Sequence, residues 1–212
     1  MLVVWGRKNS INVQKVMWTV GELDLAHERK DVGGPFGGLD TADYGALNPN
    51  RRIPTIVDGD GPAIWESHSC VRYLAARYGA GTLWPEDAAA RALADRWLDW
   101  MQTTLLPSLA PVFIGLVRTP AEERDTARIE RSARAMGETW RILDAHLEGR
   151  QFVAADALTM GDIAVGAACY RYHALDVEGL GVERPALPHV AAWYARLRER
   201  APFRTHVMIP LS

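Results

Sequence analysis

The feature that most constrains the fold of this chain is the point at which its β-strand signals stop. Short β-prone runs occur before residue 66, whereas helical periodicity dominates after Glu86. The stretch from Ala80 to Pro85 carries the glycine and proline punctuation of a linker. We therefore predict two domains, a mixed α/β domain over residues 1–81 and an all-helical domain over residues 86–212.

The first domain alternates strand and helix signals, which predicts a four-stranded mixed sheet with helices packed against it. The glycine-rich segment 33–38 should form a flexible loop, and Asp58-Gly59-Asp60-Gly61 a hairpin turn. The expected elements are, in order, a strand at residues 2–5, a helix through Val13 and Leu23, a strand within 26–32, the hairpin strands at 54–57 and 63–65, and a helix at 67–78.

The second domain shows apolar stripes at helical spacing, which predict long amphipathic helices. We expect Pro107 and Pro111 to bend or break the first of these helices. Thr159 and Asp162 have the spacing of a capping box at a later helix start, and loss of the Thr159 cap would cost on the order of 1 kcal/mol. The stripes consist of Ala90, Ala94, Trp97, Met101 and Leu105 and of Ile129, Ala133, Met136, Trp140, Leu143 and Leu147.

Composition narrows the classes of partner. Hydrophobic residues make up 48% of the 212 residues, and 24 basic against 26 acidic residues give a net charge of -2. This near-neutral balance does not predict a basic surface of the kind that binds nucleic acid or an anionic membrane. No run approaches the roughly 18 apolar residues of a membrane helix, and the N-terminus lacks a signal-peptide pattern. We therefore expect a cytoplasmic protein without nucleic-acid or membrane partners.

The cysteines and histidines show no pattern of a metal or redox centre. Cys70 and Cys169 lie far apart without C-x-x-C spacing, and the six histidines lack metal-ligand spacing. We therefore expect no metal, and we expect both cysteines to be buried as small apolar residues.

Two neighbouring segments have the properties of a site for an extended, charged peptide. Pro54 has no N–H, and a cis bond before it would turn the chain and leave the N–H and C=O of Ile53 free to pair with a ligand. Glu66 and Ser67 fall at a helix N-terminus, where free N–H groups favour a carboxylate. Glu66 could balance an ammonium, although a Glu-Ser pair that opens a helix is more often only a cap.

These motifs resemble those of the cytosolic glutathione S-transferases, and the resemblance covers essentially the whole chain. Its carriers are Asn48-Pro49, Ile53-Pro54, Asp58, Glu66-Ser67 and Arg72-Tyr73-Leu74, and the segments 5–16, 116–125 and 207–210 are similar to the bacterial glutathione S-transferase B type. The resemblance implies a thioredoxin-like first domain and a helical bundle as the second. It further implies a homodimeric, detoxifying enzyme that conjugates glutathione, its co-substrate, to small electrophiles.

The resemblance also implies site residues. A thiol near pKa 8.5 is mostly protonated at neutral pH, so a donor must stabilise the thiolate. Ser10 holds the position of this donor in serine-type relatives, with Asn12 as the alternative. A basic residue before Ile-Pro often meets a glutathione carboxylate, and Arg52 stands there, but Arg51 replaces a frequent glycine and leaves open which arginine reaches the ligand. The implied glutathione-binding residues are Arg52, Ile53, Pro54, Glu66 and Ser67.

The electrophile pocket is expected between the domains, and Phe36 could close over it or enter a dimer contact. An aromatic stripe at helical spacing is more often core, so the pocket candidates also have a structural interpretation. Competing functions are a non-catalytic partner-binding protein of this fold and a glutathione-dependent isomerase or disulfide reductase. The pocket candidates are Trp97, Trp100, Met101, Gln102 and Phe113.

Overall fold

A computed structural model describes residues 1–212 as two compact units. The sheet unit comprises Met1–Trp84 and Ala201–Ile209, and the helical unit comprises Pro85–Arg200 and Pro210–Ser212. The second predicted domain, 86–212, therefore differs from the helical unit near the C-terminus, where residues 201–209 belong to the sheet unit.

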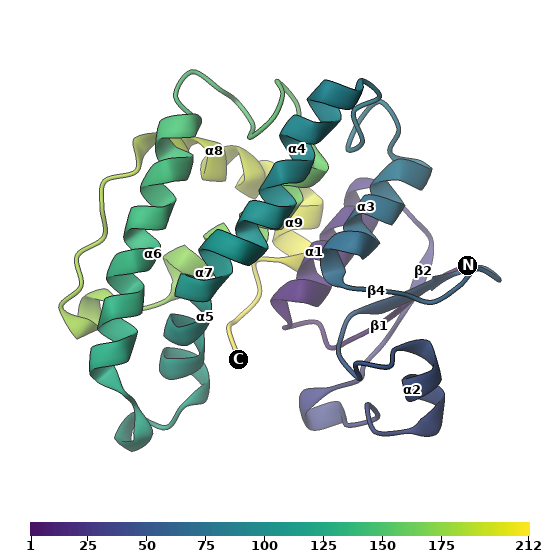
Figure 1. Ribbon diagram of the computed structural model, residues 1–212, viewed down its shortest axis with the longest axis horizontal. Helices are drawn as coiled ribbons and strands as arrows, with labels where there is room; N and C mark the ends of the chain where they lie inside the picture. Colours follow the sequence, from purple (N-terminus) through teal and green to yellow (C-terminus); the bar gives the residue numbers. More distant parts are fainter. The chain divides into compact units, whose positions relative to one another are not determined.

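The sheet unit contains a four-stranded sheet of order β2-β1-β3-β4 (Figure 1). β1 pairs in parallel with β2 and antiparallel with β3, which pairs antiparallel with β4. The predicted mixed sheet is thus confirmed. Its elements are β1 (Leu2–Trp5), α1 (Ile11–Glu22), β2 (His27–Lys30), η1 (Gly34–Phe36), α2 (Ala42–Leu47), β3 (Thr55–Asp58), β4 (Ile64–Trp65), α3 (Ser67–Tyr78) and α9 (Ala201–His206).

The core of the sheet unit joins one face of the sheet to α1 and α3. Val4 of β1 and Ile56 of β3 are fully buried against Val16 of α1 and Leu74 of α3. Their burial follows the predicted periods of two along the strands and about 3.6 along the helices. Cys70 belongs to the same core, as predicted, and burial raises the pKa of its thiol to about 12.

α9 packs on α1 within the sheet unit. The Trp18 and Phe203 rings meet edge to face with centroids 4.7 Å apart. A Cβ atom at Gly21 would lie 2.9 Å from the Cβ of Pro202, so the glycine permits a close approach of the two helices. Residues far apart in the chain therefore share one core, which explains why the C-terminal segment leaves the helical unit.

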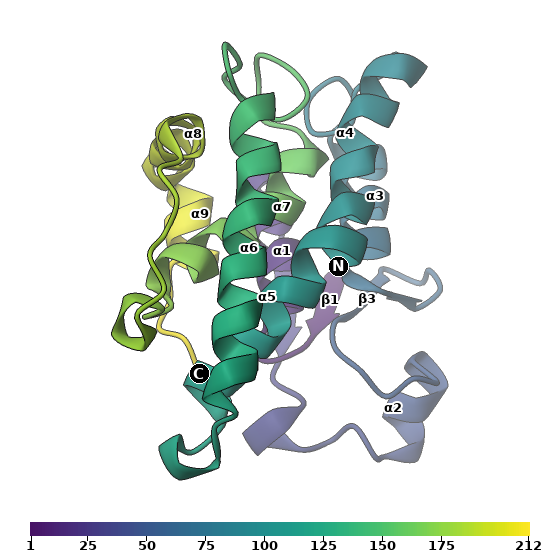
Figure 2. The ribbon, with the colours of Figure 1, turned by 60° about the vertical axis from the view of Figure 1, so that its left-hand side comes forward.

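The helical unit is built around α7, whose residues 160–169 are all buried. Asp162 lies at its start and completes the predicted capping box with Thr159. Its carboxylate also accepts hydrogen bonds from the Val153 N–H and the Trp193 indole, both at 2.9 Å. The elements are α4 (Ala88–Trp100), η2 (Met101–Leu105), α5 (Leu106–Phe113), η3 (Ile114–Arg118), η4 (Ala121–Glu123), α6 (Thr126–His146), α7 (Met160–Ala174), η5 (Glu178–Leu180) and α8 (Pro188–Glu199), of which Figure 2 shows α4 to α8 from a second side.

Three local features differ from the expectations or refine them. Of the expected bend or break at Pro107 and Pro111, the break does not occur: the helical stretch over residues 88–118 continues, with wider π-type turns at η2 and η3 on either side of α5. The glycine-rich loop holds a short 3₁₀ turn, η1. α2 was not expected, because its six residues include Gly45 and bury only Tyr44.

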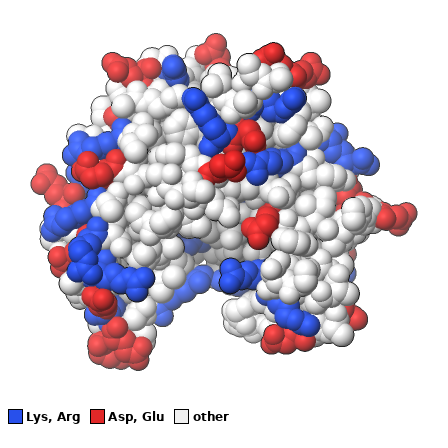
Figure 3. All heavy atoms as spheres, in the orientation of Figure 1, with Lys and Arg blue, Asp and Glu red and all other residues white.

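One segment also differs from the expectation about membrane helices. The helical stretch Ala88–Arg118 is long and apolar enough to cross a membrane by length and composition alone. Core helices of soluble proteins pass the same test, and Leu98, Met101 and Leu105 of this stretch are fully buried. Figure 3 shows basic and acidic side chains interspersed over the face in view.

Candidate functional site

The turn after β1 places Ser10 directly before α1. Ser10 is the N-cap residue in position, but its side chain makes no capping hydrogen bond, and its hydroxyl has no partner in the protein. The Ser10 carbonyl accepts from the Gln14 N–H at 2.8 Å and so anchors the first turn. Ser10 is buried, at 8% exposure, and its hydroxyl is left without a partner, which speaks against a simple capping role.

The first turn of α3 contacts the first turn of α1. The Ser67 hydroxyl donates to Asn12 Oδ1 at 3.3 Å. Ser67 is buried and lies beside Glu66, whose side chain is exposed and makes no ion pair or hydrogen bond. Glu66 adopts a φ of 66°, a left-handed backbone conformation that is uncommon for a residue other than glycine. Such outliers are more frequent at ligand-binding positions.

Ile53 and Pro54 precede β3, and the peptide bond between them is cis. Pro54 is buried and Ile53 is half-buried. Neither the N–H nor the C=O of Ile53 forms a hydrogen bond in the protein. A Cβ atom at Gly6 would lie 3.3 Å from the Ile53 Cβ, so this segment touches the turn that leads to Ser10.

Side chains of α2 and the following residue hold this segment in place. Tyr44 and Asn48 donate to the Arg52 carbonyl at 2.7 and 2.8 Å, and both also contact the Thr55 hydroxyl. Sequence reasoning treated Asn48 only as part of a motif. Its burial, at 2% exposure, was not evident from the sequence because α2 was not predicted.

The two arginines differ in the contacts that they make within the protein. Arg51 Nη1 donates to the carbonyls of Leu39 and Thr41 at 2.7 and 2.9 Å, so Arg51 ties two parts of the loop together. The Arg52 side chain is exposed and makes no ion pair or hydrogen bond in the protein. Arg52 is thus the arginine that is free to meet a ligand.

Lys15 and His68 form a buried polar contact that sequence reasoning missed. Lys15 Nζ lies 2.8 Å from His68 Nε2, and the two residues are 1% and 4% exposed. Burial, together with the charges of Lys15 and Arg72, lowers the pKa of His68 to about 2, so its ring is neutral. The available signal was a lysine within the apolar run of the predicted helix.

These segments meet at one end of the sheet unit. α1 and α3 both begin there, and each helix start contributes unpaired N–H groups and a partial positive charge. The free groups are the Ser10 hydroxyl, the Ile53 main chain, the Glu66 carboxylate and the Arg52 guanidinium. This set can hold a peptide through its main chain, ammonium and carboxylates, and it can stabilise a thiolate.

The five residues predicted to line an electrophile pocket differ in exposure. Trp97, Met101 and Phe113 are buried in the helical unit. The guanidinium groups of Arg171 and Arg118 lie 4.1 and 4.9 Å from the centroid of the Phe113 ring. Trp100 is half-buried and Gln102 is exposed. Their role at an electrophile remains a prediction.

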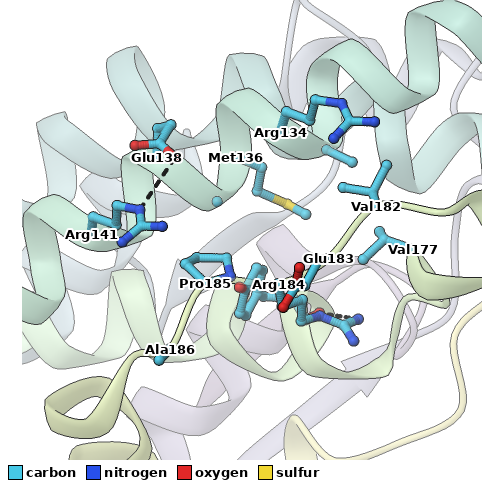
Figure 4. A pocket seen from close by; sticks show the side chains of 13 residues that line it. Arg134, Met136, Glu138, Arg141, Val177, Val182, Glu183, Arg184, Pro185 and Ala186 are labelled. Atoms are coloured by element: carbon cyan, nitrogen blue, oxygen red, sulfur yellow. Dashed lines mark hydrogen bonds and ion pairs between the residues drawn. The ribbon is translucent and has the colours of Figure 1, made fainter.

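The helical unit also has cavities of its own. One, of about 400 Å³, lies between α6 and the segment that follows α7, and Figure 4 shows Met136 at its wall with Arg134 and Arg141 to either side. Others have volumes of about 550 and 450 Å³. None of these cavities is lined by a residue predicted for the site. The structure contains no group of three or more His, Cys, Asp or Glu residues that could hold a metal ion.

Comparison with known proteins gives matches over both units. The family models described as "Glutathione S-transferase, N-terminal domain" and "Glutathione S-transferase, C-terminal domain" match residues 9–77 and 126–196. The chain is 40% identical over 213 residues to glutathione S-transferase GstB of Escherichia coli, with 100% of both chains covered. It is 32% identical over 222 residues to glutathione S-transferase 3 of Zea mays, with coverage of 99% and 95%.

A solved structure agrees with these sequence matches. It is the theta class glutathione S-transferase from Xanthomonas axonopodis pv. citri with glutathione bound, which is 43% identical and superposes with a TM-score of 0.93. The match covers 100% of this chain and 99% of that chain.

Proposed function

The chain belongs to the glutathione S-transferase family, and we propose that this glutathione transferase binds its co-substrate at the starts of α1 and α3, with Ser10 as the donor to the thiolate. The observation that carries the proposal is the unpartnered Ser10 hydroxyl at the start of α1, a helix start that the contact between Asn12 and Ser67 joins to the start of α3. The unpaired main chain of Ile53, which lies against Gly6 in the turn before Ser10, supports it. The family matches support a glutathione transferase, and the sequence resemblance supports Ser10 as the donor.

The bound peptide would be held at both ends and at its middle. The main chain of Ile53 pairs with the backbone of the cysteinyl residue, as an added strand does at a sheet edge. Glu66 binds the ammonium of the γ-glutamyl group, and Ser67 with the free N–H groups of α3 binds its carboxylate. Arg52 meets the carboxylate at the glycine end.

Activation of the thiol requires stabilisation of its charged form. The Ser10 O–H donates to the sulfur, and the free N–H groups of α1 add a positive potential, so the thiol releases its proton to solvent more readily. The thiolate then attacks an electrophilic carbon, and the new C–S bond forms as the leaving group departs or the addition completes. Asn12 is the alternative donor, because its amide N–H groups are not used in the contact with Ser67.

The electrophile is proposed to meet residues of the helical unit. Trp100 and Gln102 are the candidates whose side chains reach the surface, since the other three candidates, Trp97, Met101 and Phe113, are buried. A small aromatic electrophile, such as a chloronitroarene, would suit the face of the half-buried Trp100 indole.

Three further properties are proposed together from the family. The enzyme is a cytoplasmic homodimer whose conjugation reaction removes toxic electrophiles. Light scattering at micromolar concentration should give twice the chain mass of 23.5 kDa. A monomer mass at that concentration would contradict the homodimer.

The proposed function is tested by combining binding and turnover. We expect retention on a glutathione-affinity column, heat release on titration with glutathione, and conjugation of a chloronitroarene by the wild-type protein. Retention without turnover over a panel of halogenated, epoxide and peroxide substrates would instead favour a non-catalytic binding protein. Absence of glutathione binding would contradict the proposed site.

A further inference from the structure

The buried contact between Lys15 and His68 joins the early turns of α1 and α3. Lys15 is three residues after Asn12 on α1, about one helical turn, and His68 follows Ser67 on α3. The Lys15–His68 contact of 2.8 Å and the Asn12–Ser67 contact of 3.3 Å are therefore two neighbouring polar contacts between the same two helices.

The chemistry of the pair makes its geometry specific. A lysine ammonium has only donors, so His68 must present Nε2 as an acceptor and carry its proton on Nδ1. The lowered pKa of His68 keeps the ring in this neutral, accepting form at any pH near neutrality. Breaking a hydrogen bond between two buried polar groups is costly, so the Lys15–His68 contact favours one spacing and one register of α1 and α3.

We propose that Lys15 and His68 are positioning residues that set the spacing between the first turns of α1 and α3, and thereby the separation between Ser10 and Ser67. Ser10 acts at the thiol of the ligand, whereas Ser67 acts at its γ-glutamyl carboxylate. A rigid distance between these groups lets one extended peptide engage both at once. The inference rests on the proposed glutathione site.

A purely structural role would be the alternative, and four variants distinguish the two. His68→Gln keeps an acceptor near the position of Nε2, whereas His68→Leu removes it. The double variant Lys15→Met with His68→Leu removes both partners and restores an apolar contact, which should recover the thermal stability lost in His68→Leu. Val20→Ala is the matched control, since Val20 is fully buried on α1 in the same core.

The experiment measures the melting temperature, glutathione binding by calorimetry, and KM and kcat with a chloronitroarene for each variant. We expect His68→Gln to stay within about twofold of wild type in KM and kcat. His68→Leu and the double variant should both raise the glutathione KM and lower kcat by about tenfold each, since displacements on the order of 1 Å can have such effects. Val20→Ala should lower the melting temperature with both kinetic constants kept.

Two outcomes would overturn the proposal in distinguishable ways. If the stable double variant binds glutathione and turns over as wild type does, the pair is only structural, and the glutathione site stands. If the wild-type protein itself shows no heat of glutathione binding, the proposed site fails and the positioning role fails with it.

Discussion

The Ser67 hydroxyl donates to Asn12 Oδ1 across 3.3 Å, so the starts of α3 and α1 are joined at the candidate glutathione site. A carboxylate that arrives at α3 would compete with Asn12 for this hydroxyl. The contact therefore links the residue proposed for the γ-glutamyl group to the alternative donor for the thiol.

Removal of the groups at the start of α3 should weaken glutathione binding without unfolding the protein. Glu66→Gln and Ser67→Ala each delete a charge-assisted hydrogen bond, and we expect each to cost about 1.5–3 kcal/mol of binding free energy. Titration calorimetry measures the change, with Ser69→Ala at an exposed neighbour as the control. Wild-type affinity in both variants would remove this part of the site.

The two arginines should respond differently to truncation. Arg52→Ala should weaken glutathione binding and leave stability unchanged, because the side chain has no partner in the protein. Arg51→Ala should lower the free energy of unfolding by about 0.5–1.5 kcal/mol for each of its two hydrogen bonds to carbonyls. Calorimetry and urea denaturation separate the two effects. The reverse pattern would show that Arg51 is the ligand-binding arginine.

The capping box of α7 gives a test of stability away from the site. Thr159→Ala should lower the free energy of unfolding by about 1 kcal/mol, since it deletes an N-cap. Asp162→Ala should lower the free energy of unfolding further, by several kcal/mol. It would leave the N–H groups of Val153 and Thr159 and the Trp193 indole buried without an acceptor, and each such group costs about 1–3 kcal/mol. Equal losses of unfolding free energy in the two variants, measured by urea denaturation, would contradict the role of Asp162 as the shared acceptor of these hydrogen bonds.

Asp58 should make stability depend on acid pH. Burial would raise the pKa of Asp58, but hydrogen bonds from Tyr78 and Tyr73 and the charge of Arg77 outweigh it, so the pKa is lower than usual. A lowered folded-state pKa contributes stability that is present above the unfolded value near 3.9 and is lost as pH falls through the folded value.

The corresponding measurement is urea denaturation between pH 7 and pH 2. Wild type should lose stability more steeply below about pH 4 than Asp58→Asn does. Asp60→Asn, at an exposed carboxylate of the same hairpin turn, serves as the control. Parallel pH curves for wild type and Asp58→Asn would contradict the role of this carboxylate.

The parts of the fold that could be predicted are those whose signals lie within a short stretch of sequence. α3 runs from Ser67 to Tyr78 as expected, because a polar start, apolar residues at helical spacing and Gly79 all mark it. The capping box was predictable for the same reason. α9 could not be placed on α1, since the packing of Trp18 against Phe203 depends on residues far apart in the chain.

The candidate site likewise contains residues that could be inferred from local sequence and contacts that could not. Glu66, Ser67 and the Ile53-Pro54 segment carry local signals of helix start and turn, so their positions could be inferred. The Lys15–His68 contact and the hold of Arg51 on the Leu39 and Thr41 carbonyls are long-range side-chain geometry, and no residue pattern specifies them.

The measurement that tests the central claim most directly is the pH–rate profile of Ser10→Ala, compared with wild type and Asn12→Ala. If the Ser10 hydroxyl stabilises the thiolate, Ser10→Ala should raise the apparent pKa of bound glutathione and lower turnover at pH 7. The loss should shrink at high pH, and glutathione affinity should be largely kept. Asn12→Ala should instead lower thermal stability more than it shifts the profile. An unshifted profile in Ser10→Ala with a displaced profile in Asn12→Ala would contradict the assignment and make Asn12 the donor.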